Sequence, residues 1–230
     1  MFTAFELGII ALSLKVAAVS IVAAMPLAFG CAWLLARCTF PGKTLLGGII
    51  DLPLALPPVV VGYALLTLFG ARGPIGGFLN AAFGVTLFFT WKGAALAAAV
   101  MAMPLMVRTL RLSLEAGDPR LEGMARTLGA SRTRVFRTIT LPLAAPGLVA
   151  VTVMGFARSL GEFGATITFV SSIPGETETL PLAIYALIQT PGAESGAFRL
   201  ALISIALALL AMAASEWLAQ RLPRGAATPS

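Results

Sequence analysis

Residues 16–36 read VAAVSIVAAMPLAFGCAWLLA, a run of 21 residues without a single charge. A helix of about 20 apolar residues crosses the hydrocarbon core of a bilayer, so this run predicts a membrane-spanning helix. The rest of the chain agrees, because 58% of its 230 residues are apolar and only 11% are charged, whereas soluble proteins carry about a quarter charged residues. A soluble globular protein is therefore excluded, and the sequence predicts an all-α integral membrane protein.

Further apolar runs follow the first one along the chain. They cover residues 52–71, 88–107, 141–157 and 200–215. The second run contains Pro53, Pro57 and Pro58, which remove backbone donors, so we expect its helix to be broken or kinked. Residues 165–170 and 180–188 are also apolar, but each segment is too short to cross. We therefore expect about five spans rather than six.

Basic residues are distributed unevenly over the loops. Eleven of the 16 Lys and Arg residues follow the first, third and fifth runs, whereas Arg72, Lys92 and Arg199 fall on the opposite side. Cytoplasmic loops carry the excess of basic residues, so we expect the N-terminus outside and the C-terminus in the cytoplasm. The basic cytoplasmic loops account for the net charge of +6, so the charge is no evidence that the protein binds nucleic acid. We expect a single transmembrane domain over residues 1–224 and a tail over residues 225–230.

Several chemistries are missing from the sequence. The chain has no histidine, which excludes His-based general-base catalysis and His metal sites. Cys31 and Cys38 end an apolar run and are expected to pack rather than to bridge or bind metal. The Gly-Lys-Thr triplet at residues 42–44 resembles the end of a phosphate-binding loop, but the glycine required five residues earlier is Arg37. We expect no catalytic residue, no metal and no directly bound cofactor.

The loop at about residues 108–142 encodes a short amphipathic helix. Asp118 and Pro119 are a capping carboxylate and a first-turn proline, and Gly129 is expected to end the helix. The residues between Asp118 and Gly129 predict an apolar stripe at helical spacing, formed by Leu121, Met124, Ala125 and Leu128. They also predict an ion pair, because Glu122 lies four residues before Arg126.

A second short helix is expected to complete this loop. Ser131 can cap it, Arg132 lies in its first turn, and it extends to Ile139 before Leu141 and Pro142 turn the chain back into the membrane. The loop is basic either simply because it is cytoplasmic or because it docks on a partner. An apolar stripe in water favours docking into a partner's groove.

The spacing in this loop resembles that of permease subunits of binding-protein-dependent ABC importers. In that family Glu-Ala-Ala, three residues, Gly, nine residues, Ile, one residue and Leu-Pro follow one another. Gly129, Ile139 and residues 141–142 match, whereas the Glu-Ala-Ala positions hold Gly-Met-Ala at residues 123–125, with a glutamate one position early at Glu122. The family's loop is a coupling helix that docks in a cleft of the ATPase subunit, and the resemblance implies that role here.

Motifs outside the loop narrow the resemblance to the membrane subunits of molybdate importers. They are DLPLALPPVVVGY at 51–63, GPIG at 73–76, FTWK at 89–92, PLMVR at 104–108, RSLGEFGAT at 158–166, PGET at 174–177 and QTPG at 189–192. Sulfate and tungstate permeases share the GEFG region and remain alternatives. The resemblance implies a type I importer permease in the bacterial inner membrane. It also implies a second copy of the chain, two ATPase subunits that carry the ATP, and a periplasmic oxyanion-binding protein.

Polar and kink-forming residues inside the spans are candidates for the pathway or its gate. They are Pro57, Pro58, Gly62, Arg158 and Glu162. Arg158 and Glu162 are four residues apart and can pair, either as a structural pair or along the pathway. The prolines and Gly62 allow a gate or simply a tight helix crossing. We expect Asp51 to begin the proline-rich helix, where a carboxylate favours the helix dipole.

Two other classes of protein compete with an ABC permease. A secondary anion carrier commonly shows repeated halves and membrane-embedded coupling carboxylates. Here no internal repeat stands out, and Glu162 alone lies deep in the chain. A membrane enzyme, such as a lipid transferase, is the third class, and the sequence offers neither histidine nor a hydrolase motif for it.

Overall fold

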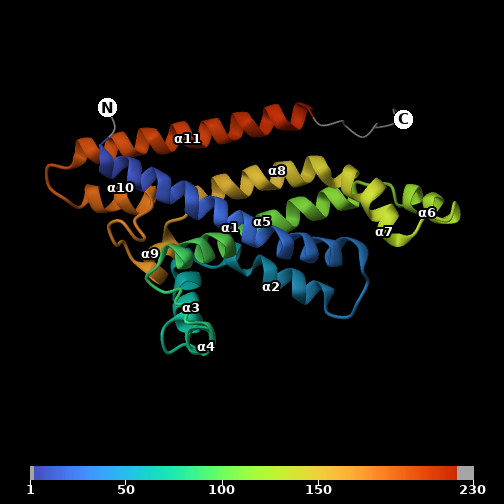
Figure 1. Cartoon of the computed structure of the whole chain (residues 1–230), viewed down its shortest axis with the longest axis horizontal. Coiled ribbons are helices and arrows are strands. Elements are labelled where there is room, and N and C mark those ends of the chain that lie inside the picture. The colour runs from blue at the N-terminus through green and yellow to red at the C-terminus, as the bar shows by residue number, and fades with distance from the viewer. Residues whose placement is uncertain (1–2, 222–230) are drawn as a thin grey trace.

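The computed structural model describes residues 3–221, which form helices and connecting loops without any strand. The helices are α1 (Ala4–Arg37), α2 (Lys43–Ala55), α3 (Pro58–Phe69), α4 (Pro74–Phe83), α5 (Trp91–Glu115), α6 (Pro119–Thr127), α7 (Arg132–Val135), the π-helical turn η1 (Phe136–Thr140), α8 (Leu141–Leu160), α9 (Gly164–Val170), α10 (Leu180–Ile188) and α11 (Glu194–Arg221). The long helices α1, α5, α8 and α11 lie alongside one another, with α6 and α7 at one end and α3, α4, α9 and α10 towards the other (Figure 1).

The expectation of about five membrane spans is confirmed. Within residues 3–221, four helical stretches are long and apolar enough to cross: Ala4–Arg37, Trp91–Glu115, Arg132–Leu160 and Glu194–Ala214. The bent pair α2 and α3 passes the same test and gives a fifth span if the pair is counted as one. The first helix begins well before Val16, because Thr3 and Glu6 form a capping box at its start.

The predicted break in the proline-rich segment is also confirmed. α2 and α3 meet at an angle of 113°, with Pro57 between them and Pro58 as the first residue of α3. Pro53 lies inside α2 without ending it. The 13 residues of α2 span about 20 Å as helix, which is less than the roughly 30 Å hydrocarbon core. The segment is therefore two elements, and α3 runs across the direction of the long helices (Figure 1).

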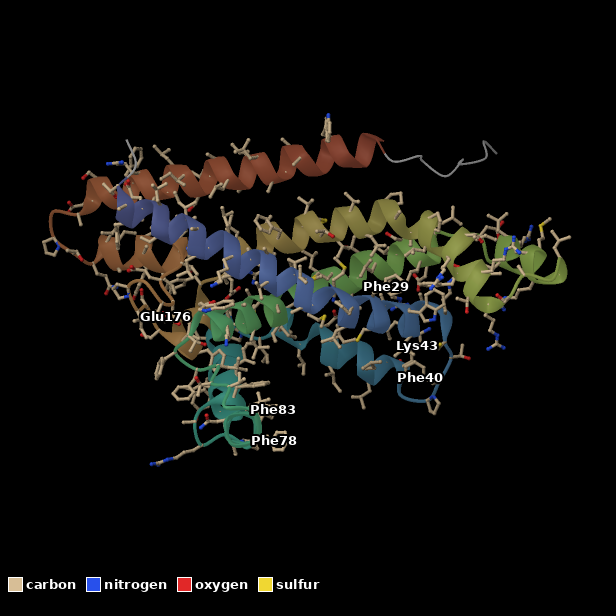
Figure 2. All side chains as sticks on the ribbon, viewed as in Figure 1. Phe29, Phe40, Lys43, Phe78, Phe83 and Glu176 are labelled. Atoms are coloured by element: carbon tan, nitrogen blue, oxygen red, sulfur yellow. The ribbon has the colours of Figure 1, made fainter. Side chains whose placement is uncertain are left out.

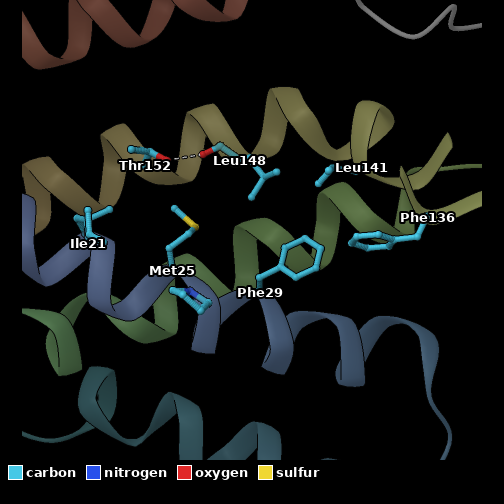
Figure 3. A pocket seen from close by; sticks show the side chains of 9 residues that line it. Ile21, Met25, Phe29, Phe136, Leu141, Leu148 and Thr152 are labelled. Atoms are coloured by element: carbon cyan, nitrogen blue, oxygen red, sulfur yellow. Dashed lines mark hydrogen bonds between the residues drawn. The ribbon is translucent and has the colours of Figure 1, made fainter. Parts of the chain in front are cut away.

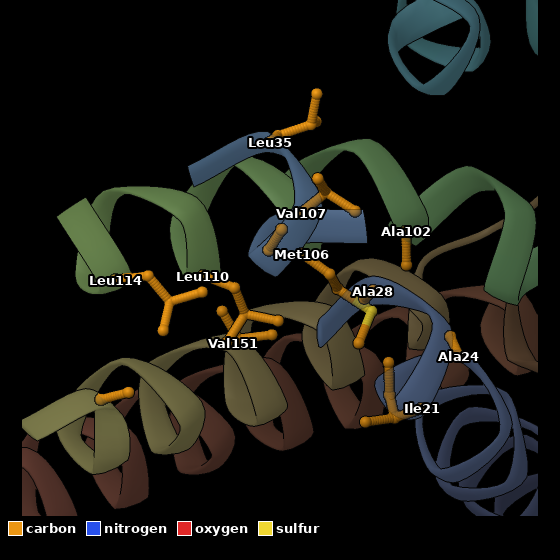
Figure 4. Packing of buried hydrophobic residues seen from close by; sticks show 12 residues of the cluster. Ile21, Ala24, Ala28, Leu35, Ala102, Met106, Val107, Leu110, Leu114 and Val151 are labelled. Atoms are coloured by element: carbon orange, nitrogen blue, oxygen red, sulfur yellow. The ribbon is translucent and has the colours of Figure 1, made fainter. Parts of the chain in front are cut away.

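Small side chains form the core between α1, α5 and α8. Ala24, Ala28 and Ala32 recur every four residues along α1 and are at most 2% exposed. They face Ala102 of α5 in the same cluster, while larger side chains such as Met106 fill the space towards α8 (Figure 4). Small residues let helix backbones approach closely, which is how helices pack in a bilayer where the surrounding lipid is equally apolar.

One expectation about the loop at about residues 108–142 is wrong. Ser131 does cap α7, since its Oγ accepts a hydrogen bond from the Arg134 N–H at 3.3 Å. The chain does not turn at Leu141 and Pro142, however, because α7, η1 and α8 form one continuous helix. The Leu141 N–H donates to the Phe136 carbonyl, five residues back. This wider turn accommodates the ring of Pro142, which would otherwise clash with the preceding turn.

Candidate functional site

The amphipathic helix α6 begins and ends as the sequence predicts. Asp118 Oδ1 accepts a hydrogen bond from the Arg120 N–H at 2.8 Å. At the other end Gly129 has φ +86°, and its N–H donates to the Arg126 carbonyl at 3.0 Å. A left-handed conformation strains residues that carry a Cβ, so Gly129 provides a sharp helix end.

The apolar face of α6 is uncovered. Leu121, Met124 and Leu128 are 45%, 63% and 88% exposed, and we call these three residues the docking stripe. Ala125 is half-buried behind the stripe, and Arg132 is exposed at the start of α7. Apolar side chains exposed together on one helical face are typical of a partner's binding site.

The opposite face of α6 is fastened to the helix bundle through Glu122. Its Oε1 accepts a hydrogen bond from Thr140 Oγ1 at 2.9 Å and lies 3.1 Å from Nη2 of Arg37, the last residue of α1. We call these three residues the Glu122 clamp. Arg126, the partner expected from helical spacing, reaches Glu122 only at 3.9 Å, and Ile139 beside Thr140 is half-buried. The Arg37 contact was missed because 85 residues separate the partners, and no local pattern indicates such a contact.

At the opposite end of the bundle, α3 crosses α9 at close range. A Cβ added to Gly62 would lie 2.6 Å from the Ala165 carbonyl oxygen and 2.8 Å from Cβ of Thr168. A Cβ added to Gly164 would lie 2.7 Å from Cβ of Pro58. The structure thus brings Pro58 and Gly62 together against α9, with Pro57 at the bend that directs α3 towards it.

Arg158 and Glu162 form the predicted ion pair, with Nη1 and Oε2 2.7 Å apart. Glu162 lies beyond the last residue of α8 and is almost fully buried, while Arg158 is half-buried. The other carboxylate oxygen of Glu162 accepts a hydrogen bond from the Ala165 N–H at 2.9 Å. Glu162 therefore joins the end of α8 to the first turn of α9, next to the α3 crossing.

Two further charged side chains have partners that sequence spacing does not show. Asp51 lies inside α2 rather than at its start, so the expectation of a helix-capping carboxylate is wrong. Instead it accepts two hydrogen bonds from Arg108 of α5, at 3.0 and 2.8 Å. Lys15 Nζ lies 3.7 Å from the ring centroid of Trp91 in a cation–π contact.

The two ends of the molecule carry different groups. Phe40 lies on the α1–α2 connection and Lys43 is the first residue of α2, both at the end that also carries α6, whereas Phe78 and Phe83 project from α4 (Figure 2). Cys31 and Cys38 are free thiols and are half-buried. Within residues 3–221 no group of three or more His, Cys, Asp or Glu side chains is placed to hold a metal ion.

The chain is similar in sequence to known membrane components of transport systems. A family described as binding-protein-dependent transport system inner membrane component matches residues 24–224. The chain is 63% identical over 209 residues to the molybdenum transport system permease protein of Escherichia coli strain K12, covering 91% of each. It is 58% identical over 219 residues to that of Haemophilus influenzae, covering 95% of this chain and 96% of the relative. Identity to the sulfate transport system permease protein of Salmonella typhimurium is 44% over 158 residues, covering 69% of this chain and 57% of that one.

Solved structures of two transporters have similar folds. One is a bacterial ABC transporter involved in the import of the acidic polysaccharide alginate, with a TM-score of 0.76 and 16% identity over 96% of this chain and 81% of that one. The other is an amino acid ABC transporter, with a TM-score of 0.67 and 17% identity over 95% and 94% of the two chains. At these identities the likeness concerns the fold.

Proposed function

Because the chain belongs to the family of binding-protein-dependent transport system inner membrane components, we propose that two copies of it form the membrane pathway of an ATP-driven molybdate importer. It is a multi-pass inner-membrane permease with the fold of type I ABC importers. ATP is hydrolysed by separate ATPase subunits, so the permease itself is not an enzyme. Molybdate is favoured over sulfate because the molybdenum permeases of Escherichia coli and Haemophilus influenzae match more than nine-tenths of the chain, at higher identity than the sulfate permease.

The mechanism rests on the observation that one face of α6 is exposed whereas the other face contacts the helix bundle. The docking stripe is free to enter a cleft of the ATPase, while the Glu122 clamp ties the same helix to α1 and to the end of η1, directly before α8. Closure of two ATPases on ATP would bring the two α6 helices together. The clamp and the continuous α7–α8 helix would then carry that displacement into the spans.

The pathway itself is assigned to the region around the bent α2–α3 pair. Pro57, Pro58 and Gly62 lie at the bend and at the α9 crossing, and the Arg158–Glu162 pair borders the same crossing. Glu162 neutralises the charge of Arg158, so Arg158 would bind a dianionic oxyanion weakly rather than tightly. Conduction needs such weak binding, because a tightly held ion leaves slowly.

The first experiment measures ATP hydrolysis in liposomes that contain this chain with its ATPase and a periplasmic binding protein loaded with molybdate or sulfate. Stimulation by the molybdate-loaded protein alone is the expected result. If only the sulfate-loaded protein stimulated hydrolysis, the substrate would be sulfate instead of molybdate. Uptake of molybdate by vesicles that hold this chain without any ATPase would instead indicate a secondary carrier.

The docking role of α6 predicts the effect of Gly129→Asp. Aspartate at φ +86° strains the helix end and adds a charge beside the docking stripe, so ATPase binding and stimulated hydrolysis should fall at least tenfold, equivalent to about 1.4 kcal/mol. Gly192→Asp is the matched control, because Gly192 has φ +81° but lies between α10 and α11. Equal activity of the two variants would contradict the docking assignment.

A further inference from the structure

An apolar groove runs between α1 and α8, separate from the docking stripe and the α3–α9 crossing. Its volume is about 540 Å³, and its lining includes Ile21, Met25, Phe29, Phe136, Leu148 and Thr152 (Figure 3). Thr152 is the one polar side chain among the lining residues, and its hydroxyl donates to the Leu148 carbonyl at 2.7 Å. The groove therefore offers an occupant an apolar wall, and its volume lies in the range of small-molecule sites, about 300–1,000 Å³.

Aromatic rings close the cytoplasmic end of this groove. The Phe136 ring meets Phe29 and Trp33 edge-on, with centroids 6.1 and 5.4 Å apart. Arg132 precedes Phe136 by four residues and Arg137 follows it directly, and both side chains are exposed. Neither arginine has a carboxylate within 4.0 Å in the part of the chain that the structure describes. The apolar groove thus ends at Phe136, which two exposed arginines flank along the chain, and we call Arg132 and Arg137 the basic rim.

We propose that this groove binds an anionic phospholipid of the cytoplasmic leaflet. One acyl chain lies between α1 and α8, and the phosphate sits at the basic rim. An acyl chain gains little by exchanging other lipid tails for an equally apolar groove. Selectivity for this lipid therefore comes from charge-assisted hydrogen bonds between the guanidinium groups and the phosphate, at an interface where anionic lipids gather.

A second copy of the chain fits the groove less well. Two copies in one membrane share an orientation, so a two-fold contact centred on the groove would bring both basic rims together at the cytoplasmic end. Arg132 and Arg137 of both copies would then repel one another, whereas a phosphate neutralises them. The inference requires only that α1 and α8 cross the membrane. It does not depend on the substrate or on the ATPase.

The test measures lipid retained by the purified chain. The protein is reconstituted with equal amounts of phosphatidylglycerol and phosphatidylcholine and extracted with mild detergent, and bound lipid is counted by native mass spectrometry. We expect retention to favour phosphatidylglycerol, and Arg137→Gln to lower that preference about fivefold, since one basic residue at an anionic surface contributes about 1 kcal/mol. Val22→Trp, which fills the groove, should abolish retention of both lipids.

Matched controls lie elsewhere on the exposed surface. Arg72→Gln removes an exposed arginine at the other end of the bundle, and Leu209→Trp enlarges an exposed side chain on α11. Both should retain phosphatidylglycerol like the unaltered chain. Equal retention of the two lipids by the unaltered chain, or unchanged preference in Arg137→Gln, would overturn the proposal. Loss of dimer with unchanged lipid in Val22→Trp would assign the groove to a second copy instead.

Discussion

Glu122 is the residue that holds α6 in place. Its contacts with Arg37 and Thr140 are shielded, since the Glu122 and Arg37 side chains are only 14% and 18% exposed. Removing the charge should leave Arg37 without its closest partner.

We therefore expect Glu122→Gln to lower the free energy of unfolding by about 1.5–3 kcal/mol, the usual contribution of a hydrogen bond to a charged group. The thermal unfolding midpoint in detergent measures this loss. Glu115→Gln is the control, because Glu115 pairs with Arg111 in an exposed i,i+4 arrangement that contributes about 0.5 kcal/mol or less. Equal losses in the two variants would show that the clamp adds no more than a surface pair.

Glu178 gives the protein a pH dependence that arises outside the spans, in the connection between α9 and α10. Its side chain is buried, and Oε2 has no hydrogen-bond partner among the residues that the structure describes. Burial raises the pKa of Glu178 above its ordinary value, and the nearby Ser172 hydroxyl opposes part of that shift. Between the ordinary and the raised pKa the folded chain keeps a proton that the unfolded chain loses, so stability falls as the pH rises through this window.

Glu178→Gln should remove this contribution. The unfolding midpoint of the unaltered chain should fall more steeply than that of the variant as the pH rises from about 4.5, the ordinary value for a glutamate. Glu176→Gln, at an exposed position two residues away, should leave the steeper profile in place. Parallel profiles for the unaltered chain and Glu178→Gln would contradict the assignment.

At the scale of elements, the α3–α9 crossing depends on the missing side chain at Gly62. In Gly62→Ala the new methyl group meets backbone at Ala165 rather than the end of a flexible side chain, so the helices must separate. We expect a loss of about 1–3 kcal/mol in stability, as for other overpacked contacts, together with reduced molybdate uptake. In Gly47→Ala, in α2, no described residue lies within 4 Å of the new Cβ, so this variant should be neutral or slightly stabilising. An unchanged stability of Gly62→Ala would show that α3 and α9 are not closely packed at this crossing.

The elements differ in how far the sequence predicts them. The caps at Asp118 and Gly129 and the break at Pro57 are local chemistry, and all three are predicted correctly. The sequence does not predict that α7 continues into α8, because a proline normally indicates a helix boundary. The π turn that accommodates Pro142 has no recognisable sequence pattern. The partners of Asp51 and Glu122 depend on tertiary packing, which one chain's periodicity does not contain.

At the scale of the whole molecule, the charge distribution predicts which end faces the cytoplasm. In a chain without Cys31 and Cys38, Leu128→Cys and Phe78→Cys place exposed thiols at the α6 end and on α4. A membrane-impermeant maleimide applied to intact spheroplasts should label Phe78→Cys at once and Leu128→Cys only after lysis. The reverse pattern would invert the orientation expected from the basic loops.

The alanine stripe of α1 has a consequence for how the permease changes shape. Side chains of one carbon have no rotamers to exchange, so the close contacts at Ala24, Ala28 and Ala32 offer no alternative packing with α5. We therefore expect α1, α5 and α8 to move as one rigid body, with hinges confined to its margins. The 113° bend between α2 and α3 is the margin that lies beside the proposed pathway.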